Sequence, residues 1–226
     1  CWERTADGGP FLIGSGGAGA GRVQNENAVR LSINNGEVWN AVLEGKYTAG
    51  YNDVRDIDIK AIIHDGSSTL NQKCGLTKGI EAHRKVEFVL SVNLFLNTNC
   101  KYADIVLPAT TQWERYGTLS GNRDHLIWFQ QVTEPLFEAK DDAWITVELL
   151  KRLGFEEEAE TLTSVSDAQQ MYNRLAGSWV ISEDGKEREP LLTITKEDIE
   201  EMGVEGDPQQ GRITLKEFRE AGVYTV

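Results

Sequence analysis

The stretch KYADIVLPATT at residues 101–111 decides the fold of this chain. Ile105, Val106 and Leu107 form an apolar, largely β-branched run of the kind that a sheet buries on both faces. Pro108 has no N–H to donate to a neighbouring strand, so we expect the strand to end there. Ligand sites in open α/β sheets lie just beyond the carboxyl ends of such strands. The stretch therefore predicts an α/β domain with a candidate site after residue 108.

The segments around this strand alternate between strand-like and helix-like patterns. Strands are expected at residues 59–64, 87–92, 103–107 and 126–132, and helices at 26–47, with a break near residues 34–36, and at 77–85 and 141–153. Strand, helix, strand, connector, strand is the order of a parallel, doubly wound sheet. We therefore predict an α/β fold with a partial doubly wound parallel sheet, similar to a dinucleotide-binding domain.

Three regions follow from this pattern. Residues 1–56 are expected to form a glycine-rich connector and helices, residues 57–154 the α/β core, and residues 155–226 a mainly helical C-terminal appendage. Within the core, Thr77 is suited to cap its helix. The last core helix has one face that we expect to be buried and should end at Gly154; this face carries Trp144, Val147, Leu150 and Leu153.

Composition and charge exclude some functions. The net charge of −13 argues against binding to a phosphate backbone, which needs a basic surface, so no nucleic-acid partner is expected. An acidic surface usually serves solubility. No apolar run approaches the length that crosses a bilayer, so no direct membrane contact is expected.

The cysteines and histidines offer no metal site in the sequence. No two cysteines form a C-x-x-C pair, which leaves zinc and iron–sulfur clusters without ligands in this segment. No histidine has a carboxylate or cysteine at ligand spacing, and none is assigned a catalytic role. His83 is expected on the surface of its helix. The residues concerned are Cys1, Cys74, Cys100, His64, His83 and His125.

A glycine run near the start fits the G-x-G-x-x-G pattern with Gly14, Gly16 and Gly19. A dinucleotide fingerprint needs a full strand before it and a helix directly after it, followed by an acidic residue at the end of the next strand. Only residues 11–13 precede the run as a strand, and two helix-like segments follow it. A flexible connector is the favoured interpretation, with a nicotinamide-dependent dehydrogenase as the alternative.

The wording of residues 101–115 closely resembles a signature of the molybdopterin oxidoreductases, the dimethyl sulfoxide reductase superfamily. Further blocks resemble the family in the same order, at residues 59–72, 87–93, 121–123 and 138–144. The resemblance covers roughly residues 57–154. It implies a molybdenum ion carried by two molybdopterin guanine dinucleotides.

The resemblance implies contacts to one guanine dinucleotide. A carboxylate accepts the two adjacent N–H groups of guanine, ribose needs groups that donate and accept, and diphosphate takes backbone N–H groups or a cation. Ser68 stands where the family usually has asparagine, and Asn93 where it usually has aspartate, so this contact loses a charge. The expected cofactor-binding residues are Ser67, Ser68, Asn71, Val92, Asn93, Arg115 and Asp142.

Each of these residues also has a structural interpretation. The structural interpretation of Asp142 is that it caps its helix, although Asp141 competes for that role. Arg115 pairs with Glu114 or Asp104, and Ser68 and Asn71 are ordinary turn residues. Asn93, at the carboxyl end of a strand, is the hardest to explain by structure alone.

Length adds an expectation about the whole protein. The family's catalytic subunits are several times longer than 226 residues and carry the molybdenum ligand, and often an iron–sulfur cluster, in an upstream segment. We expect an internal piece with no catalytic residue and no metal ligand, which works with the rest of the catalytic subunit. The resemblance implies oxygen-atom transfer to or from an S-oxide, N-oxide or similar acceptor. It also implies an iron–sulfur electron-transfer subunit and a membrane anchor as partners. The alternative is a free-standing nucleotide-binding module.

Overall fold

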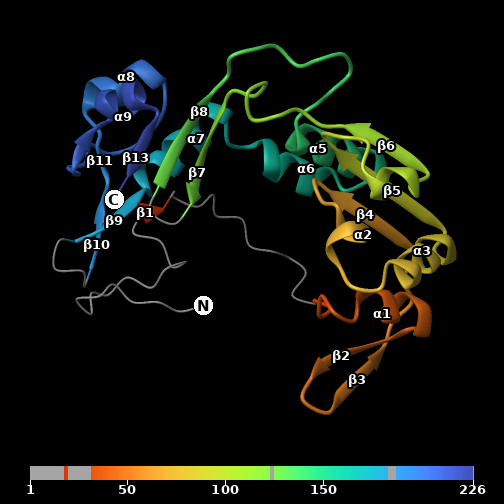
Figure 1. Ribbon diagram of the computed structural model, residues 1–226. Coiled ribbons are helices and arrows are strands. Elements are labelled where there is room, and N and C mark those ends of the chain that lie inside the picture. Colours follow the sequence, from red (N-terminus) through yellow and green to blue (C-terminus); the bar gives the residue numbers. More distant parts are fainter. Residues whose placement is uncertain (1–17, 20–31, 123–124, 183–186, 226) are drawn as a thin grey trace. The chain divides into compact units, whose positions relative to one another are not determined.

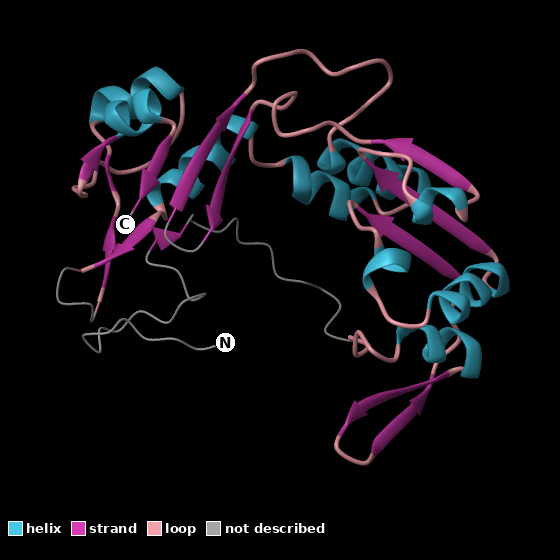
Figure 2. Cartoon of the chain, viewed as in Figure 1, coloured by secondary structure: helices cyan, strands magenta, loops and turns pink. Residues whose placement is uncertain are grey.

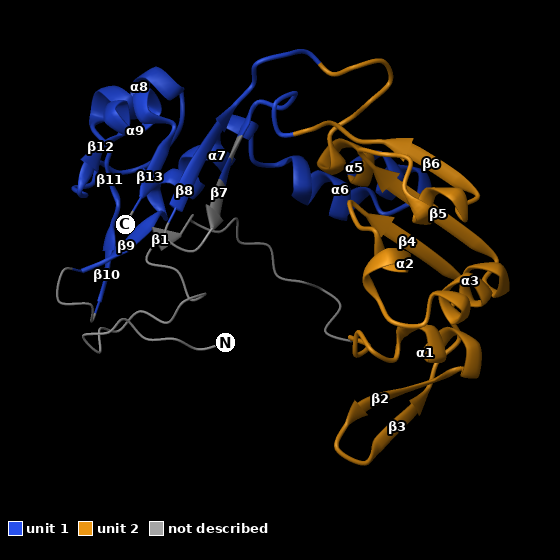
Figure 3. Cartoon of the chain, viewed as in Figure 1, with its two compact units in different colours: residues 1–25, 112–134, 147–226 blue, residues 26–111, 135–146 orange. Residues whose placement is uncertain are grey.

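The computed structural model describes residues 18–19, 32–122, 125–182 and 187–225 (Figure 1). The chain divides into two compact units (Figure 3). The parallel-sheet unit comprises residues 26–111 and 135–146. The C-terminal unit comprises residues 1–25, 112–134 and 147–226. Each unit has its own sheets and its own buried cluster.

Three parallel strands form the sheet of the parallel-sheet unit (Figure 2). They are β4 (Ala61–Asp65), β5 (Phe88–Asn93) and β6 (Ile105–Pro108), in the order β4-β5-β6. The register places Ile63 opposite Leu90, and Leu90 opposite Ile105. These strands confirm the expected α/β class with a parallel sheet, and β6 ends at Pro108 as its missing N–H requires. The expected burial of this strand on both faces is wrong, because Ile105 is 48% exposed and Val106 is 38% exposed at the edge of the sheet.

The connections between these strands are helical. Helices α2 (Thr69–Gln72) and α3 (Leu76–Lys85) join β4 to β5, and α4 (Thr98–Lys101) joins β5 to β6. A doubly wound sheet has a point where the strand order reverses, and the three described strands follow one another without a reversal. The doubly wound arrangement is therefore not seen in the described part of the chain.

Two helix boundaries differ from the prediction because of glycines. Helix α3 begins at Leu76 with Gly75 at the N-cap position, so Thr77 lies inside the first turn and does not cap the helix. In the helical region expected at residues 26–47, α1 (Val38–Glu44) follows the expected break near residues 34–36 and ends three residues earlier than predicted. Gly45 adopts a left-handed φ of 69° and its N–H bonds the Ala41 carbonyl, which ends the helix.

The chain turns into a hairpin directly after Gly45. Strands β2 (Lys46–Gly50) and β3 (Asp53–Asp56) pair antiparallel next to α1, at one end of the unit (Figure 1). Lys46 and Tyr47, which we expected to be helical, therefore lie in a strand. The buried apolar cluster of this unit is small and consists of Trp39, Val42, Leu70 and Ala82.

The C-terminal unit contains several short strands. Strands β7 (Gly117–Asn122), β8 (His125–Gln130) and β13 (Val223–Thr225) form an antiparallel sheet in the order β13-β8-β7. The strand expected at residues 126–132 is β8. The others pair in two small sheets: β1 (Ala18–Gly19) with β9 (Trp179–Ile181) and β10 (Arg188–Pro190), and β11 (Leu192–Thr193) with β12 (Ile213–Thr214).

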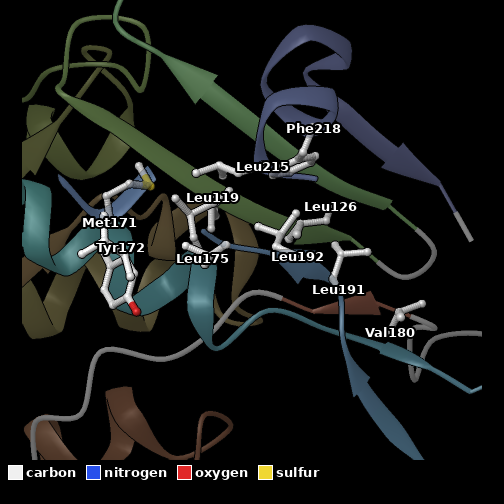
Figure 4. Packing of buried hydrophobic residues seen from close by; sticks show 12 residues of the cluster. Leu119, Leu126, Met171, Tyr172, Leu175, Val180, Leu191, Leu192, Leu215 and Phe218 are labelled. Atoms are coloured by element: carbon white, nitrogen blue, oxygen red, sulfur yellow. The ribbon is translucent and has the colours of Figure 1, made fainter. Parts of the chain in front are cut away.

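Helices complete the C-terminal unit. They are α6 (Glu156–Thr163), α7 (Asp167–Ala176), α8 (Lys196–Met202) and α9 (Leu215–Ala221). A large apolar cluster joins α7, α8 and α9 to the strands, with Leu175 of α7, Leu126 of β8 and Phe218 of α9 all fully buried (Figure 4). The expected helical appendage describes only part of residues 155–226, since this segment also supplies strands to all three sheets of the unit.

Helix α5 (Asp142–Leu153) runs from the parallel-sheet unit into the C-terminal unit. Its expected buried face is wrong in part, because Trp144 is 50% exposed and Leu153 is 67% exposed. Val147 is buried as expected, and Ile145, which lies outside the expected face, is buried as well. Gly154 follows the helix with a φ of 84°, which confirms it as the end signal.

Candidate functional site

The loop after β4 is held against the end of β5. Gly66 has a φ of 59°, which lets the chain turn sharply as it leaves the strand. Its N–H donates to the Val92 carbonyl at 2.9 Å. The carboxyl ends of β4 and β5 therefore meet at one edge of the sheet, as expected for parallel neighbours.

Three asparagine side chains fix the next peptide group of this loop. The Nδ2 atoms of Asn93, Asn97 and Asn99 donate to the Ser67 carbonyl oxygen at 2.8, 3.1 and 3.1 Å. Asn99 is fully buried, and its Oδ1 accepts from the Leu70 N–H at 2.9 Å. Because buried amides are costly unless they are hydrogen-bonded, these contacts hold the loop in one conformation.

A chain of side-chain contacts runs from this loop into the unit. Ser67 Oγ lies 2.9 Å from Thr69 Oγ1, which lies 3.1 Å from His64 Nδ1. His64 Nε2 lies 2.7 Å from His83 Nε2, and His83 Nδ1 lies 2.6 Å from the Gly79 carbonyl oxygen. The two imidazole rings are nearly parallel, with an interplanar angle of 10° and centroids 5.0 Å apart, and they meet edge to edge through the contact between their Nε2 atoms. The chain links α3 to the carboxyl end of β4.

Burial keeps both imidazoles neutral. Desolvation, reinforced by the neighbouring His83, lowers the pKa of His64 from 6.5 to about 4. Burial also lowers the pKa of His83, and its bond to Gly79 opposes that shift in part. His83 is only 4% exposed, so its predicted surface position is wrong. The side chain points into the unit, where it meets His64 and the Trp39 ring.

The third part of this edge lies at the end of β6. The Lys140 N–H donates to the Pro108 carbonyl at 3.1 Å, and the Thr110 N–H donates to the Lys140 carbonyl at 3.0 Å. Ala109 and Lys140 form a parallel bridge, and the Ala109 N–H donates to the Asn93 carbonyl. The start of α5 is thereby fixed to the same edge as Asn93.

The competition between the two aspartates at this helix start has a clear outcome. Asp141 Oδ1 accepts from the Ala143 N–H at 2.8 Å, and the Asp141 carbonyl accepts from the Ile145 N–H. Asp141 is therefore the helix cap. Asp142 is the first residue of α5 and is half-buried. Asp142 follows the cap by one residue and follows Lys140, whose backbone is bonded to the end of β6, by two.

The expected site residues divide by location. Ser67 and Ser68 follow β4, Asn93 ends β5, and Asp142 is fixed beside β6, so all four belong to one edge of the sheet. The other three depart from that group.

Asn71 is exposed on α2, and the side chain of Val92 is buried in β5, so that its carbonyl is what reaches the loop. Arg115 belongs to the C-terminal unit, and it is half-buried there. Whether any of the seven residues contacts a cofactor stays a prediction.

Sequence reasoning missed the residues that organise this edge. Asn97 carries a local signal, because it is a helix-capping residue type directly before α4 and its Oδ1 accepts from the Cys100 N–H. Asn99 carries none, because its partners lie about 30 residues earlier in the chain. His64 and His83 carry none, because their contact joins a strand to a helix 19 residues later.

The described residues contain no group of three or more histidine, cysteine, aspartate or glutamate side chains that could hold a metal ion. Cys74 is exposed and Cys100 is buried, and both are free thiols. No helix in the described ranges is both long enough and apolar enough to cross a bilayer.

Comparison with known proteins identifies the family. Residues 15–152, more than half of the chain, match the family model of the molybdopterin oxidoreductases. The chain belongs to the molybdopterin oxidoreductase family. This result confirms the resemblance seen in residues 101–115 and extends it on the N-terminal side. It also argues against the alternative of a nicotinamide-dependent dehydrogenase. That alternative depended on the glycine run, of which Gly14 and Gly16 lie outside the described residues and Gly19 lies in β1.

Curated members of the molybdopterin oxidoreductase family share roughly a third of the matched residues. Trimethylamine-N-oxide reductase 1 from Escherichia coli (strain K12) is 37% identical over 124 residues, which cover 52% of this chain and 14% of the relative. Trimethylamine-N-oxide reductase from Vibrio cholerae is 35% identical over 104 residues, covering 44% of this chain and 12% of the relative. The chain thus corresponds to a small part of the relatives it matches.

A solved structure was also compared with the chain. Acetylene hydratase from Pelobacter acetylenicus superposes with a TM-score of 0.45 at 24% identity, over 53% of this chain and 16% of that one.

The sheet edge provides groups that suit a nucleotide. Asp142 supplies a carboxylate, which accepts two N–H groups at once, and Ser67, Ser68 and Asn93 supply hydroxyl and amide groups for a ribose. These groups fit a base and a sugar better than a diphosphate, which prefers cations. The hydrogen-bond donors and acceptors of this edge are therefore compatible with the nucleoside part of a molybdopterin guanine dinucleotide.

Proposed function

We propose that this chain supplies part of the nucleotide site for one molybdopterin guanine dinucleotide in a longer molybdenum oxidoreductase. The observation that carries the proposal is the convergence of three strand ends on one edge, with Ser67, Asn93 and Asp142 attached to it. Parallel sheets bind ligands at this edge. In the complete protein, further strands beside β4–β6 would give the doubly wound sheet that the sequence predicts.

Each group has a distinct role in this proposal. The Asp142 carboxylate accepts the paired N–H groups of guanine, which a single acceptor cannot satisfy. The amide of Asn93 holds the Ser67 carbonyl, so Asn93 positions the loop whether or not it also contacts the ligand. The hydroxyls of Ser67 and Ser68 bind ribose. Asn71 and Arg115 would reach the cofactor only from outside this edge.

The complete protein would carry out oxygen-atom transfer to or from an N-oxide, S-oxide or similar acceptor. The names of the relatives, trimethylamine-N-oxide reductases, favour an N-oxide. The cofactor supplies the two-electron chemistry, and the residues of this chain bind and orient its nucleotide and take no part in catalysis. The partners proposed are the rest of the catalytic subunit, an iron–sulfur subunit and a membrane anchor, with residues 57–154 as the cofactor-binding core.

The test is cofactor retention in the complete protein. A lost charge-assisted hydrogen bond costs about 1.5–3 kcal/mol, so Asp142→Ala should lower the guanine dinucleotide released per protein at least tenfold under dilution. Asp141→Ala is the matched control, since it removes a cap and should leave cofactor content unchanged. Full occupancy in Asp142→Ala, with only a lower thermal midpoint, would show that the residue is structural.

A further inference from the structure

The hydrogen bonds between Ser67 and α3 have a direction that the atoms themselves determine. The Gly79 carbonyl oxygen only accepts, so the hydrogen of His83 must lie on Nδ1, 2.6 Å away. A neutral imidazole has one N–H, which leaves His83 Nε2 as an acceptor. His64 Nε2, at 2.7 Å, therefore carries the hydrogen of the second ring.

The same reasoning continues to the loop. With its hydrogen on Nε2, His64 accepts at Nδ1, so the Thr69 hydroxyl donates to it across 3.1 Å. Thr69 has a single hydroxyl hydrogen, and its Oγ1 must then accept from its other neighbours. Those neighbours are Ser67 Oγ at 2.9 Å and Asn99 Nδ2 at 3.2 Å. The hydrogen of the Ser67 hydroxyl is thus committed to Thr69.

Reversing one bond of this chain is costly. If the Ser67 hydrogen turned toward a ligand, two oxygens would lie 2.9 Å apart with no hydrogen between them, because Thr69 uses its own on His64. Ser67 Oγ therefore presents lone pairs only. The three amides on the Ser67 carbonyl fix the peptide from which this side chain projects.

We propose that the His64–His83 pair sets the ligand specificity of this loop by making the Ser67 hydroxyl an obligate hydrogen-bond acceptor. Such a group binds an O–H or N–H donor, as on a ribose or a guanine, and repels a phosphate oxygen. His64, His83 and Thr69 are positioning residues, and Ser67 is the residue that contacts the ligand. This inference rests on the proposed nucleotide site and assigns its nucleoside half to the β4 loop.

The direction of the chain is tested without any ligand. In the complete protein labelled with ¹⁵N-histidine, the nitrogen chemical shifts report which ring atom carries hydrogen, and His64→Gln and His83→Gln assign the signals. We expect the hydrogen of His83 on Nδ1 and that of His64 on Nε2. The opposite tautomer at either ring would overturn the proposal.

The specificity is tested with guanosine and inorganic pyrophosphate as separate probes on the cofactor-free complete protein. Ser67→Ala should weaken guanosine binding roughly tenfold and leave pyrophosphate unchanged. Thr69→Val, which frees the Ser67 hydrogen, should strengthen pyrophosphate binding relative to guanosine. Thr69→Ser keeps the hydroxyl and should behave as the unchanged protein.

The outcomes separate the two proposals. If Ser67→Ala binds pyrophosphate more weakly, Ser67 donates to phosphate, and its role as an obligate acceptor is overturned. If Ser67→Ala binds guanosine as well as the unchanged protein does, the role of Ser67 is also overturned, although the nucleotide site itself stands. If the unchanged protein binds neither probe, the nucleotide site itself is wrong and the specificity inference falls with it.

Discussion

The two units bury different kinds of side chain. The C-terminal unit closes over a cluster of twelve buried residues that includes Phe218, Leu126 and Leu175 and is apolar apart from one tyrosine hydroxyl. The parallel-sheet unit has only four residues in its apolar cluster. Among the described residues it holds six of the eight buried polar side chains: His64, His83, Ser91, Asn93, Asn99 and Thr110.

This difference separates stability from binding. Apolar burial stabilises a unit without directing a hydrogen bond anywhere, whereas a buried polar group is tolerated only when its partners are in place. Four of the six, His64, Asn93, Asn99 and Thr110, lie at or beside the carboxyl ends of its strands, and His83 joins them through His64. Ser91 lies inside β5, next to Cys100. This concentration of buried polar groups at the strand ends supports the proposed nucleotide site.

The largest expected effect tests the apolar unit. Phe218 is fully buried, so Phe218→Ala should lower the free energy of unfolding by about 3–5 kcal/mol through lost burial and a cavity. Urea unfolding followed by tryptophan fluorescence measures the loss. Phe95→Ala is the control, since Phe95 is 75% exposed and its truncation should change stability little. A loss below 1 kcal/mol for Phe218→Ala would mean that the cluster does not hold this unit together.

The second prediction concerns pH and the polar unit. Below pH 6.5 the unfolded chain protonates at His64, whereas the folded state does so only near pH 4. The contribution of neutral His64 to the free energy of unfolding is therefore complete above pH 6.5 and decreases as the pH drops. The decrease ends below about pH 4, where His64 is protonated in both states. The loss should reach roughly 2–3 kcal/mol.

Urea titrations from pH 8 to 4 check this dependence. The double variant His64→Gln with His83→Gln should show a flatter profile than the unchanged chain, although it starts from a lower stability. His125→Gln serves as the control and should keep the full dependence. An unchanged profile in the double variant would assign the pH effect to other groups.

A third prediction tests how closely the small apolar cluster between α1, α2 and α3 is packed. A Cβ on Gly79 would lie 2.6 Å from Leu70 Cδ2 and 3.1 Å from Trp39 Cε2, both in the buried cluster. Overpacking costs about 1–3 kcal/mol, and better helix propensity returns up to about 1. We expect Gly79→Ala to lose about 1–2 kcal/mol in thermal or urea unfolding.

The control for this change is Gly50→Ala. Its Cβ would meet no atom closer than 3.9 Å, so the stability should change by less than about 0.5 kcal/mol. Equal effects for the two variants would show that the tight contact at Gly79 relaxes freely and that the small cluster is not closely packed.

The smallest expected effect lies at the start of α5. Asp141→Ala removes the side-chain bond to the Ala143 N–H and should cost about 1 kcal/mol. Asp141→Asn keeps an acceptor oxygen and should recover most of the loss. If both substitutions cost the same, the charge of Asp141 matters more than the capping bond.

Local patterns predicted the parts of the fold that depend on neighbours in sequence. The run Ile105–Val106–Leu107 with Pro108 gave β6 and its end, and Gly154 gave the end of α5. Local patterns failed where tertiary packing decides. Trp144 has helical spacing with Val147 yet is exposed, because the spacing defines a face and does not say what covers it.

The candidate site was predicted at the level of the sheet edge, and not at the level of its hydrogen bonds. Asn93 was selected because polar residues at the carboxyl ends of parallel strands converge. Its bond to the Ser67 carbonyl, 26 residues earlier in the chain, depends on strand order and register. The contact between His64 and His83 needs the packing of α3 on the sheet, which no local pattern contains.

The three amide groups on the Ser67 carbonyl also change the electronic character of that peptide. Donors that converge on one oxygen draw electron density toward it, which strengthens the amide resonance and stiffens the bond to Ser68. The carbonyl stretch of Ser67, isolated by ¹³C labelling, should therefore absorb at a lower infrared frequency than that of an ordinary loop peptide. The peptide group that follows the Ser67 side chain is therefore rigid and strongly polarised, which restricts the position of the Ser67 hydroxyl.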